Sequence, residues 1–346
     1  MKFVATDDQV QFRQSVEHFA GPFDLARRRD FRRAESGYPR ERWMALADLG
    51  LLALVVPEDH GGLGGSVGDL AVVAEALGRT VAIDPWLENG FLPLALAPGL
   101  DGLASGERLA ALAFAEPGRR YELQPQAVVV DATGRVSGRK TAVLGGAGAA
   151  VLLVTARGPA GFALVAVDAA APGVARRAYA VTDGSLACEA TFEAAPGQLL
   201  PVDATRFGQV VATARLLAAA QMLGCGQRLF DDTLDYVKQR EQFGVPIGSF
   251  QAIQHRLVEC YARLEQARSQ VLRATLAPHG FSAAAAGAKA HVGEAVAKVA
   301  DEAVQLHGGM GQTDELAVSH AFKRFMLLDR LFGDRSQCLR DYANAA

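Results

Sequence analysis

Residues able to contact a phosphate or to carry a proton gather in four short segments of the chain. Arg240–Gln251 and Gln305–Gly311 combine polar side chains with Gly-rich turns, whereas Ala115–Gly118 and Leu331–Gln337 each carry one carboxylate. Arginine offers several donors to phosphate oxygens, and glycine lets backbone N–H groups approach them closely. A carboxylate can act as a general base where its surroundings raise its pKa. Each segment alone would also fit an ordinary surface turn.

Composition and charge exclude several classes of function. The 346 residues carry Lys+Arg 35 against Asp+Glu 38, a formal net charge of -3, so we expect no nucleic-acid partner. The four cysteines are widely spaced and form no CxxC pair, which argues against a disulfide framework or a metal site and favours a cytoplasmic location. The longest uncharged stretch, Thr141–Ala156, is shorter than the roughly 20 apolar residues of a membrane span. We therefore expect no membrane span, and no secretory signal.

The first third of the chain predicts helices around a Gly-rich turn. Apolar residues within Trp43–Gly50 recur at spacings of three and four, as one face of a helix requires. After the long turn Gly61–Ser66, Ser66 is expected to cap a second helix. Asp69 would complete a capping box, and Gly78 would end that helix.

The middle of the chain is rich in short β-type runs separated by Gly, Pro and Asp. The clearest are Ala127–Val130, Ala150–Val154 and Gly161–Val167. Runs at this spacing predict a small antiparallel sheet or barrel rather than βαβ units.

Long Ala-rich helices are predicted after the sheet. Asp203 precedes the first helix, Ser249 opens the second, and the third runs from Ser282 to a stop at Gly308. The apolar stripe of the second helix includes Tyr261. Narrow stripes of this kind are typical of closely packed bundles. The fold class predicted is α+β, with an N-terminal helical domain (1–108), a middle β-domain (109–202) and a C-terminal helical domain (203–346).

Four segments resemble motifs of the acyl-CoA dehydrogenase family. Pro57–Ser66 resembles its proline-glutamate-x-x-glycine-glycine turn, and Arg240–Gln251 resembles its C-domain signature. Gln305–Gly311 is similar to its glutamine-x-x-glycine-glycine-x-glycine segment, and Ala115–Gly118 looks like a shortened threonine-glutamate-proline-glycine loop. Their order and the helix–sheet–helix frame also agree, so the resemblance covers nearly the whole chain and implies the fold of that family.

The resemblance implies FAD bound at a subunit interface, with its ADP half on the C-terminal helices of the neighbouring subunit. The positions that match the family's cofactor contacts are Arg240, Phe243, Gln251, Gln305, Gly309, Ser336 and Gln337. Positions that face the flavin in the family have changed, because Ala115 replaces a threonine and Ala142 and Leu144 replace a tryptophan and a threonine. The resemblance thus implies a retained ADP half and a reduced flavin half.

Neither of the two family positions for the catalytic glutamate holds a glutamate here. Gly333 stands at one, and Ala214 stands at the other, beside Arg215, which matches a family arginine and is a supporting candidate. Asp334 is the nearest carboxylate and the candidate base. The adjacent Arg335 would lower the pKa of Asp334 if the two were close, which is the wrong direction for abstracting an α-proton. Glu116 is interpreted as a carboxylate that structures its loop rather than as a base.

The resemblance implies FAD-dependent α,β-desaturation of an acyl-CoA thioester, with electron-transferring flavoprotein as the acceptor. Because the ADP contacts are kept and the base is lost, we expect the base-lacking subunit of an enzyme assembled with a homologous subunit. It would resemble the heteromeric acyl-CoA dehydrogenases of steroid side-chain breakdown. Two alternatives remain: a self-sufficient flavoenzyme of the same fold with Asp334 as base, and a non-catalytic scaffold that binds no FAD.

Overall fold

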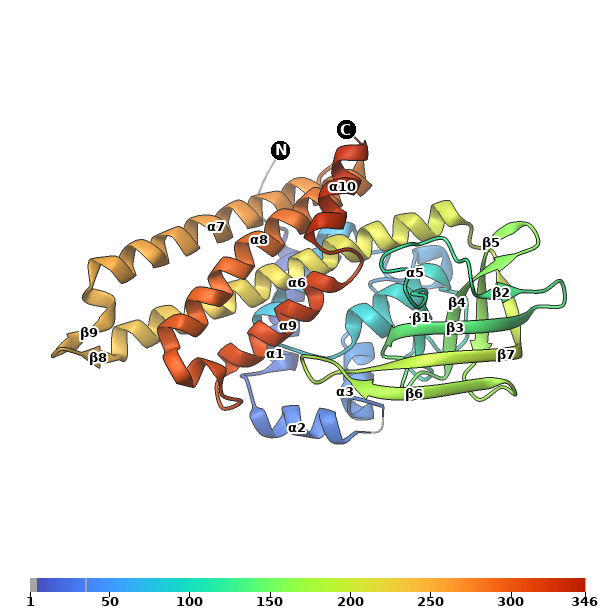
Figure 1. Ribbon diagram of the computed structural model, residues 1–346, viewed down its shortest axis with the longest axis horizontal. Helices are drawn as coiled ribbons and strands as arrows, with labels where there is room; N and C mark the ends of the chain where they lie inside the picture. Colours follow the sequence, from blue (N-terminus) through green and yellow to red (C-terminus); the bar gives the residue numbers. More distant parts are fainter. Residues whose placement is uncertain (1–4, 35, 346) are drawn as a thin grey trace. The chain divides into compact units, whose positions relative to one another are not determined.

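The computed structural model describes residues 5–34 and 36–345 and follows the predicted order of helices, sheet and helices (Figure 1). The chain divides into two compact units. Unit 1 takes the described residues within 1–25, 66–83 and 215–346, and unit 2 takes those within 26–65 and 84–214. The predicted family fold class, with helices before and after a β region, is confirmed. The boundaries at 108 and 202 stay a prediction.

Unit 2 is built on a mixed sheet. Its strands are β1 (Ala110–Ala113), β2 (Val129–Val130), β3 (Arg135–Leu144), β4 (Val151–Gly158), β5 (Gly161–Asp168), β6 (Val174–Ala180) and β7 (Leu186–Leu200). Strand β4 runs parallel to β1 and β2, and the other pairs are antiparallel. The pairings β4–β2, β2–β3, β3–β7, β7–β5 and β5–β4 form a closed circuit, which is a barrel, one of the two predicted forms. The sheet is not wholly antiparallel as predicted, because β4 pairs in parallel with β1 and β2.

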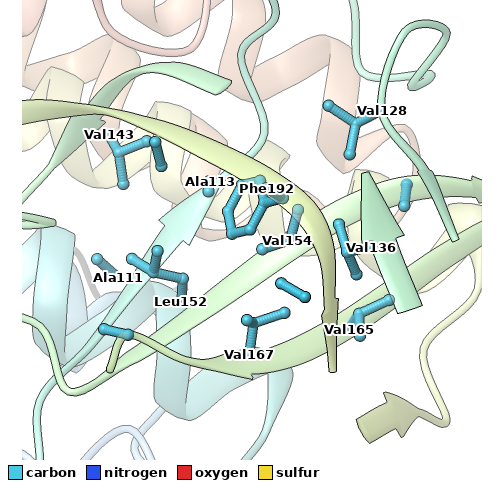
Figure 2. Close-up of a cluster of buried hydrophobic side chains, with 14 of the residues drawn as sticks. Ala111, Ala113, Val128, Val136, Val143, Leu152, Val154, Val165, Val167 and Phe192 are labelled. Atoms are coloured by element: carbon cyan, nitrogen blue, oxygen red, sulfur yellow. The ribbon is translucent and has the colours of Figure 1, made fainter. Parts of the chain in front are cut away.

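Small and β-branched side chains fill the interior of this sheet around one aromatic ring, Phe192 (Figure 2). Val136, Val154 and Val165 are fully buried, and Phe192 is 2% exposed. Val and Ala side chains suit a narrow interior because they pack without large rotamer freedom. The low aromatic content of the chain is therefore compatible with a closed β core.

Short helices complete unit 2. They are α3 (Arg40–Asp48), the 3₁₀ turn η1 (Glu58–His60), the π-helical turn η2 (Trp86–Phe91) and α5 (Leu92–Leu96), while α2 (Leu25–Arg33) begins at the boundary of the units. Trp43 and Trp86 are buried, and their indole nitrogens donate to the carbonyls of Gly106 and Leu51, at 3.1 and 2.9 Å. The helical face predicted around Trp43 is therefore a core face.

Unit 1 is helical. Its elements are α1 (Asp7–Ala20), α4 (Val67–Arg79), α6 (Ala204–Gln239), whose first residues belong to unit 2, β8 (Glu241–Gln242), β9 (Val245–Pro246), η3 (Ile247–Ser249), α7 (Gln251–Thr275), α8 (Phe281–His307), η4 (Gly308–Gln312), α9 (Ala317–Arg330) and α10 (Arg335–Ala345). Ser66 and Asp69 form the predicted capping box of α4. Helix α8 ends where predicted, with Gly308 as its cap at φ 59°.

Helices α4 and α6 approach each other closely at two glycines. A Cβ atom on Gly78 would lie 2.0 Å from the carbonyl oxygen of Gln221, and one on Gly224 would lie 2.0 Å from that of Glu75. Only glycine fits at either position. The prediction that Gly78 ends its helix is wrong, since α4 continues to Arg79 and Gly78 provides the contact surface.

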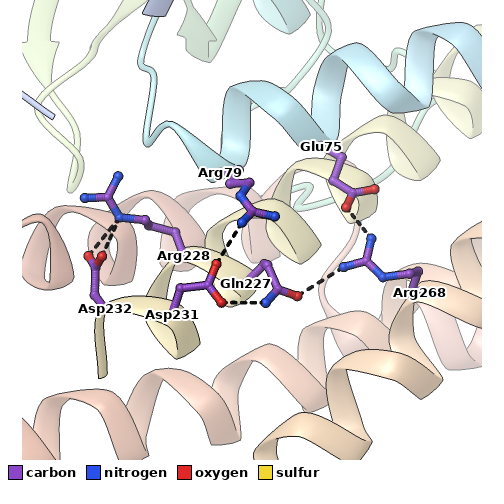
Figure 3. A network of polar contacts seen from close by, with 7 residues as sticks. All are labelled: Glu75, Arg79, Gln227, Arg228, Asp231, Asp232 and Arg268. Atoms are coloured by element: carbon purple, nitrogen blue, oxygen red, sulfur yellow. Dashed lines mark hydrogen bonds and ion pairs between the residues drawn. The ribbon is translucent and has the colours of Figure 1, made fainter. Parts of the chain in front are cut away.

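A polar network crosses the same helices (Figure 3). Arg79 pairs with Asp231 at 2.9 Å, and Gln227 donates to Asp231 at 2.9 Å. The side-chain oxygen of Gln227 accepts from Arg268, which also pairs with Glu75. These contacts join α4, α6 and α7 and hold the part of α6 that leads to Arg240.

Candidate functional site: an open end and a closed turn

Helix α6 ends at Gln239 and runs through Arg240 into a tight hairpin. Gln242 pairs with Val245, so Phe243 and Gly244 form a two-residue loop with φ of 56° and 81°. Two successive positive φ values are the pattern of a type I′ turn. A bulky residue rarely adopts such a φ, so the turn holds Phe243 in a strained conformation. The Phe243 side chain is 92% exposed.

The polar groups at this hairpin are available for a ligand. The side chain of Arg240 is exposed and makes no hydrogen bond or ion pair with any other described residue. Gln251 is exposed at the first residue of α7. The ring of Phe243 meets Phe250 edge-on, with 6.2 Å between ring centroids.

The end of α8 lies beside the end of α6. His307 stacks on Tyr236 with 4.3 Å between ring centroids, and its Nδ1 donates to the carbonyl of Ala303 at 2.8 Å. Gln305 and Gly309 flank this buried histidine and are themselves exposed. A Cβ on Gly309 would meet nothing within 4 Å. The structure thus brings the two predicted ADP-binding segments to the same end of the bundle, with His307 as a packing residue.

Two hollows open at this end of unit 1. One, of about 560 Å³, is lined mainly by apolar side chains of α6 and α7, including Leu234, Leu257 and Tyr261. The other, of about 520 Å³, includes Tyr236 and His307. Tyr261 was expected on the buried stripe of α7, yet it is 55% exposed because it faces the first hollow.

A second predicted site, the turn between α9 and α10, is buried and differs in character. Phe332 and Gly333 have φ of 57° and 117°, and the value at Gly333 lies where residues with a side chain rarely occur. Asp334 is 9% exposed, and its Oδ1 accepts a hydrogen bond from the backbone N–H of Gln337 at 2.9 Å. Asp334 therefore occupies the N-cap position of α10, where a carboxylate satisfies an otherwise unpaired helix donor.

Two buried cations hold the carbonyls of this turn. The Nε atom of Arg215 donates to the carbonyl of Phe332 at 2.9 Å, and its Nη2 pairs with Asp341 at 2.8 Å. The Nζ atom of Lys289 donates to the carbonyls of Asp329 and Gly333, at 2.8 and 2.7 Å. Arg215, from α6, and Asp334, the two predicted catalytic residues, thus meet at this turn.

Lys289 is the residue that the sequence interpretation missed. It is 1% exposed, and burial lowers its pKa to about 8. A signal was present, because Lys289 precedes the buried Val292 and Val296 by three and seven residues and so lies on the core face of α8. A lysine on such a face needs buried acceptors.

Ser336 and Gln337, the remaining predicted cofactor contacts, lie in the first turn of α10. Ser336 is exposed. The side chain of Gln337 donates to Asp341 and accepts from Arg340, both at 2.8 Å. These two residues follow Asp334 in the first turn of α10 and belong to a different segment of the chain from the hairpin at Phe243.

Glu116 in unit 2 is fully engaged. Its carboxylate accepts from the backbone of Gln126, Ala127 and Val128 and from Lys140, at 2.8 to 3.1 Å. Burial by itself would raise the pKa of Glu116, but these hydrogen bonds outweigh it and lower the pKa to about 2. Such a carboxylate is a poor base, which supports its interpretation as a loop-structuring group.

Within residues 5–34 and 36–345, no three His, Cys, Asp or Glu side chains are grouped so that they could hold a metal ion. None of the helices in these ranges is both long enough and apolar enough to cross a membrane.

Known proteins share this fold and sequence over most of the chain. Residues 6–106 match the N-terminal domain of acyl-CoA dehydrogenase, and residues 206–343 match its C-terminal domain. Acyl-CoA dehydrogenase IpdE2 of Mycolicibacterium smegmatis is 32% identical over 326 residues, covering 89% of this chain and 88% of the relative. The chain belongs to the acyl-CoA dehydrogenase family, whose members are flavoprotein oxidoreductases that bind FAD.

Two solved structures extend the comparison. A variant of the Tcur3481-Tcur3483 steroid ACAD is 31% identical, with a TM-score of 0.87 over 97% of this chain and 96% of that one. The ChsE4-ChsE5 complex from Mycobacterium tuberculosis is 27% identical, with a TM-score of 0.88 over 99% and 98%. The predicted resemblance to steroid-type, two-chain members of the family is therefore confirmed.

The exposed residues at the hairpin after α6 and at the end of α8 suit the ADP half of FAD. An unpaired guanidinium matches pyrophosphate oxygens, and the uncrowded Gly309 allows close approach of a phosphate. An exposed ring such as Phe243 offers an apolar face to ribose or adenine. When bound in a member of this family, FAD supplies the hydride acceptor.

Proposed function

We propose that this chain is the base-lacking subunit of a heteromeric FAD-dependent acyl-CoA dehydrogenase and supplies the ADP half of the FAD site to a homologous companion. One observation carries the proposal. The arginine at the ADP position is exposed and has no side-chain partner among residues 5–34 and 36–345, whereas the turn at the family's base position is buried and hydrogen-bonded within the chain. The companion would provide the flavin pocket and the glutamate.

The substrate and acceptor follow from the same proposal. The assembly would act on an acyl-CoA thioester and pass electrons to electron-transferring flavoprotein. The steroid ACAD and the two-chain complex among the structural relatives support a companion subunit and a substrate of the steroid side-chain type.

Visible absorbance of the purified protein tests the proposal. The chain would be purified alone and together with a glutamate-containing homologue, and flavin would be measured from the absorbance near 450 nm. We expect stoichiometric flavin only in the co-purified assembly. Flavin and turnover from the chain alone would overturn the proposal.

Two variants separate the alternatives. If the chain were a scaffold that binds no FAD, Arg240→Ala would leave the flavin content of the assembly unchanged. Arg263→Ala, at a partly exposed arginine of α7 that pairs within its own helix, is the matched control. If Asp334 were the base of a self-sufficient enzyme, Asp334→Ala would abolish α-proton exchange by the chain alone. The N-cap hydrogen bond of Asp334 favours a structural role instead.

A further inference from the structure

Lys289 is a buried cation of unit 1, and its side chain donates to main-chain carbonyls. Both of its acceptors are carbonyl oxygens, one in the last turn of α9 and one at Gly333. A buried ammonium held by carbonyls is costly to desolvate, so the contact is retained only where the geometry it imposes is needed or the partners compensate fully.

The geometry that Lys289 imposes reaches the start of α10. Its two hydrogen bonds span the segment from Asp329 to Gly333 and hold Gly333 at φ 117°. The next residue, Asp334, caps α10, and its carbonyl accepts from the N–H of Cys338 at 2.9 Å. A Cβ on Gly333 would lie 3.3 Å from both the Arg215 Nη2 and the Cys338 Sγ atoms. A side chain at position 333 would therefore be strained by the backbone conformation and would crowd Arg215 and Cys338.

We infer that Lys289 is a positioning residue that fixes the turn at Gly333 and, through it, the first turn of α10 with the predicted cofactor contacts Ser336 and Gln337. The two hydrogen bonds of Lys289 go to Asp329 and Gly333, which are not among the predicted cofactor contacts. The part of this inference that concerns FAD rests on the proposed function, whereas the part that concerns the turn does not. The same arrangement disfavours a glutamate at position 333, because a residue with a side chain is strained at φ 117° and its Cβ would crowd Arg215 and Cys338.

Hydrogen exchange of the backbone tests the first part without flavin. Lys289→Gln keeps a polar group but is too short to bridge two carbonyls. Lys298→Gln, on the same helix, removes a partly exposed lysine that pairs with Glu302 and is the matched control. We expect exchange of the Gln337 and Cys338 amides to accelerate about tenfold in Lys289→Gln, and not in the control, as the loss of roughly one hydrogen bond's free energy implies.

Flavin affinity of the co-purified assembly tests the second part, at a temperature at which both variants are folded. We expect about tenfold weaker FAD binding in Lys289→Gln than in Lys298→Gln, and recovery in Lys289→Arg. If Lys289→Gln does not fold, Gly333→Ala perturbs the same turn from its other side and should expose the same two amides. Unchanged protection of these amides, or a flavin affinity equal to that of the control, overturns the inference. Failure of the proposed function would appear separately: the assembly with the unsubstituted chain would bind no flavin, or its flavin content would not change in Arg240→Ala.

Discussion

The hairpin end and the Gly333 turn of unit 1 treat their polar groups in opposite ways. At the hairpin, Arg240 is exposed without a side-chain partner among the described residues, and Phe243 is held outward in a strained conformation. At the turn, Arg215 bonds the carbonyl of Phe332 and the carboxylate of Asp341, Lys289 bonds main-chain carbonyls, and Asp334 caps a helix. A strained backbone and an unpaired charge cost free energy, which a bound ligand can offset. A turn whose polar groups bond one another needs no ligand.

Glu116 in unit 2 is hydrogen-bonded within the chain, like the groups at the Gly333 turn. Its replacement should have the largest effect on the free energy of unfolding. Its pKa of about 2, against an ordinary value of 4.5, corresponds to about 3 kcal/mol of unfolding free energy at neutral pH. Because the unfolded state binds more protons between these values, this stabilisation is complete above pH 4.5 and is lost as the pH falls through about 2. Urea unfolding of Glu116→Gln should thus show a deficit at pH 7 that shrinks toward pH 3. A deficit independent of pH would contradict the ionised, bonded carboxylate.

Arg240→Ala tests the open end. Removing an exposed, unpaired guanidinium should leave the unfolding midpoint unchanged while FAD binding by the assembly weakens by roughly 10- to 100-fold, the loss of charge-assisted hydrogen bonds. Fluorescence titration with FAD measures the affinity, and Arg263→Ala is the control. A fall in stability with unchanged flavin affinity would show that Arg240 stabilises the fold and does not contact FAD.

A pair of glycine variants sharpens the contrast. Gly333→Ala puts a side chain at φ 117° and should lower the free energy of unfolding by about 1–3 kcal/mol. Gly309→Ala meets no atom within 4 Å and should leave stability nearly unchanged, yet weaken FAD binding by obstructing the close approach of phosphate. Denaturant unfolding and flavin titration of both variants give the test. Equal losses of unfolding free energy in the two variants would show that a side chain is tolerated no better at Gly309 than at Gly333.

Phe243→Asn should change the free energy of unfolding by less than Glu116→Gln or Gly333→Ala, and in the opposite direction. Asparagine adopts positive φ more readily than phenylalanine, so the hairpin should become more stable by roughly 0.5–1 kcal/mol. FAD binding should weaken at the same time, because the exposed ring is lost. A thermal melt and a flavin titration on the same sample would check both. A destabilised variant would mean that the turn stores no strain.

Local patterns in the sequence predicted much of the fold because they act over a few residues. The Ser66–Asp69 capping box and the stop at Gly308 were both predictable, since each is decided within one helical turn. Helix α7 begins at Gln251 rather than Ser249, because Ile247–Ser249 forms a 3₁₀ turn first. Gly78 was misread as a helix end, because its contact with Gln221 joins segments distant in sequence.

The site was predictable only in part, for the same reason. The resemblance to the family was what pointed to Arg240, Gln305 and Gly309 as one binding region. That Tyr236 stacks on His307 and so unites the two segments is decided by how α6 packs against α8. The sequence by itself determined the family, the order of elements and the absence of glutamate at positions 214 and 333. Only the tertiary structure decided which polar groups remain open, because pairing such as that of Lys289 with the carbonyl of Gly333 requires residues far apart in the chain to be packed together.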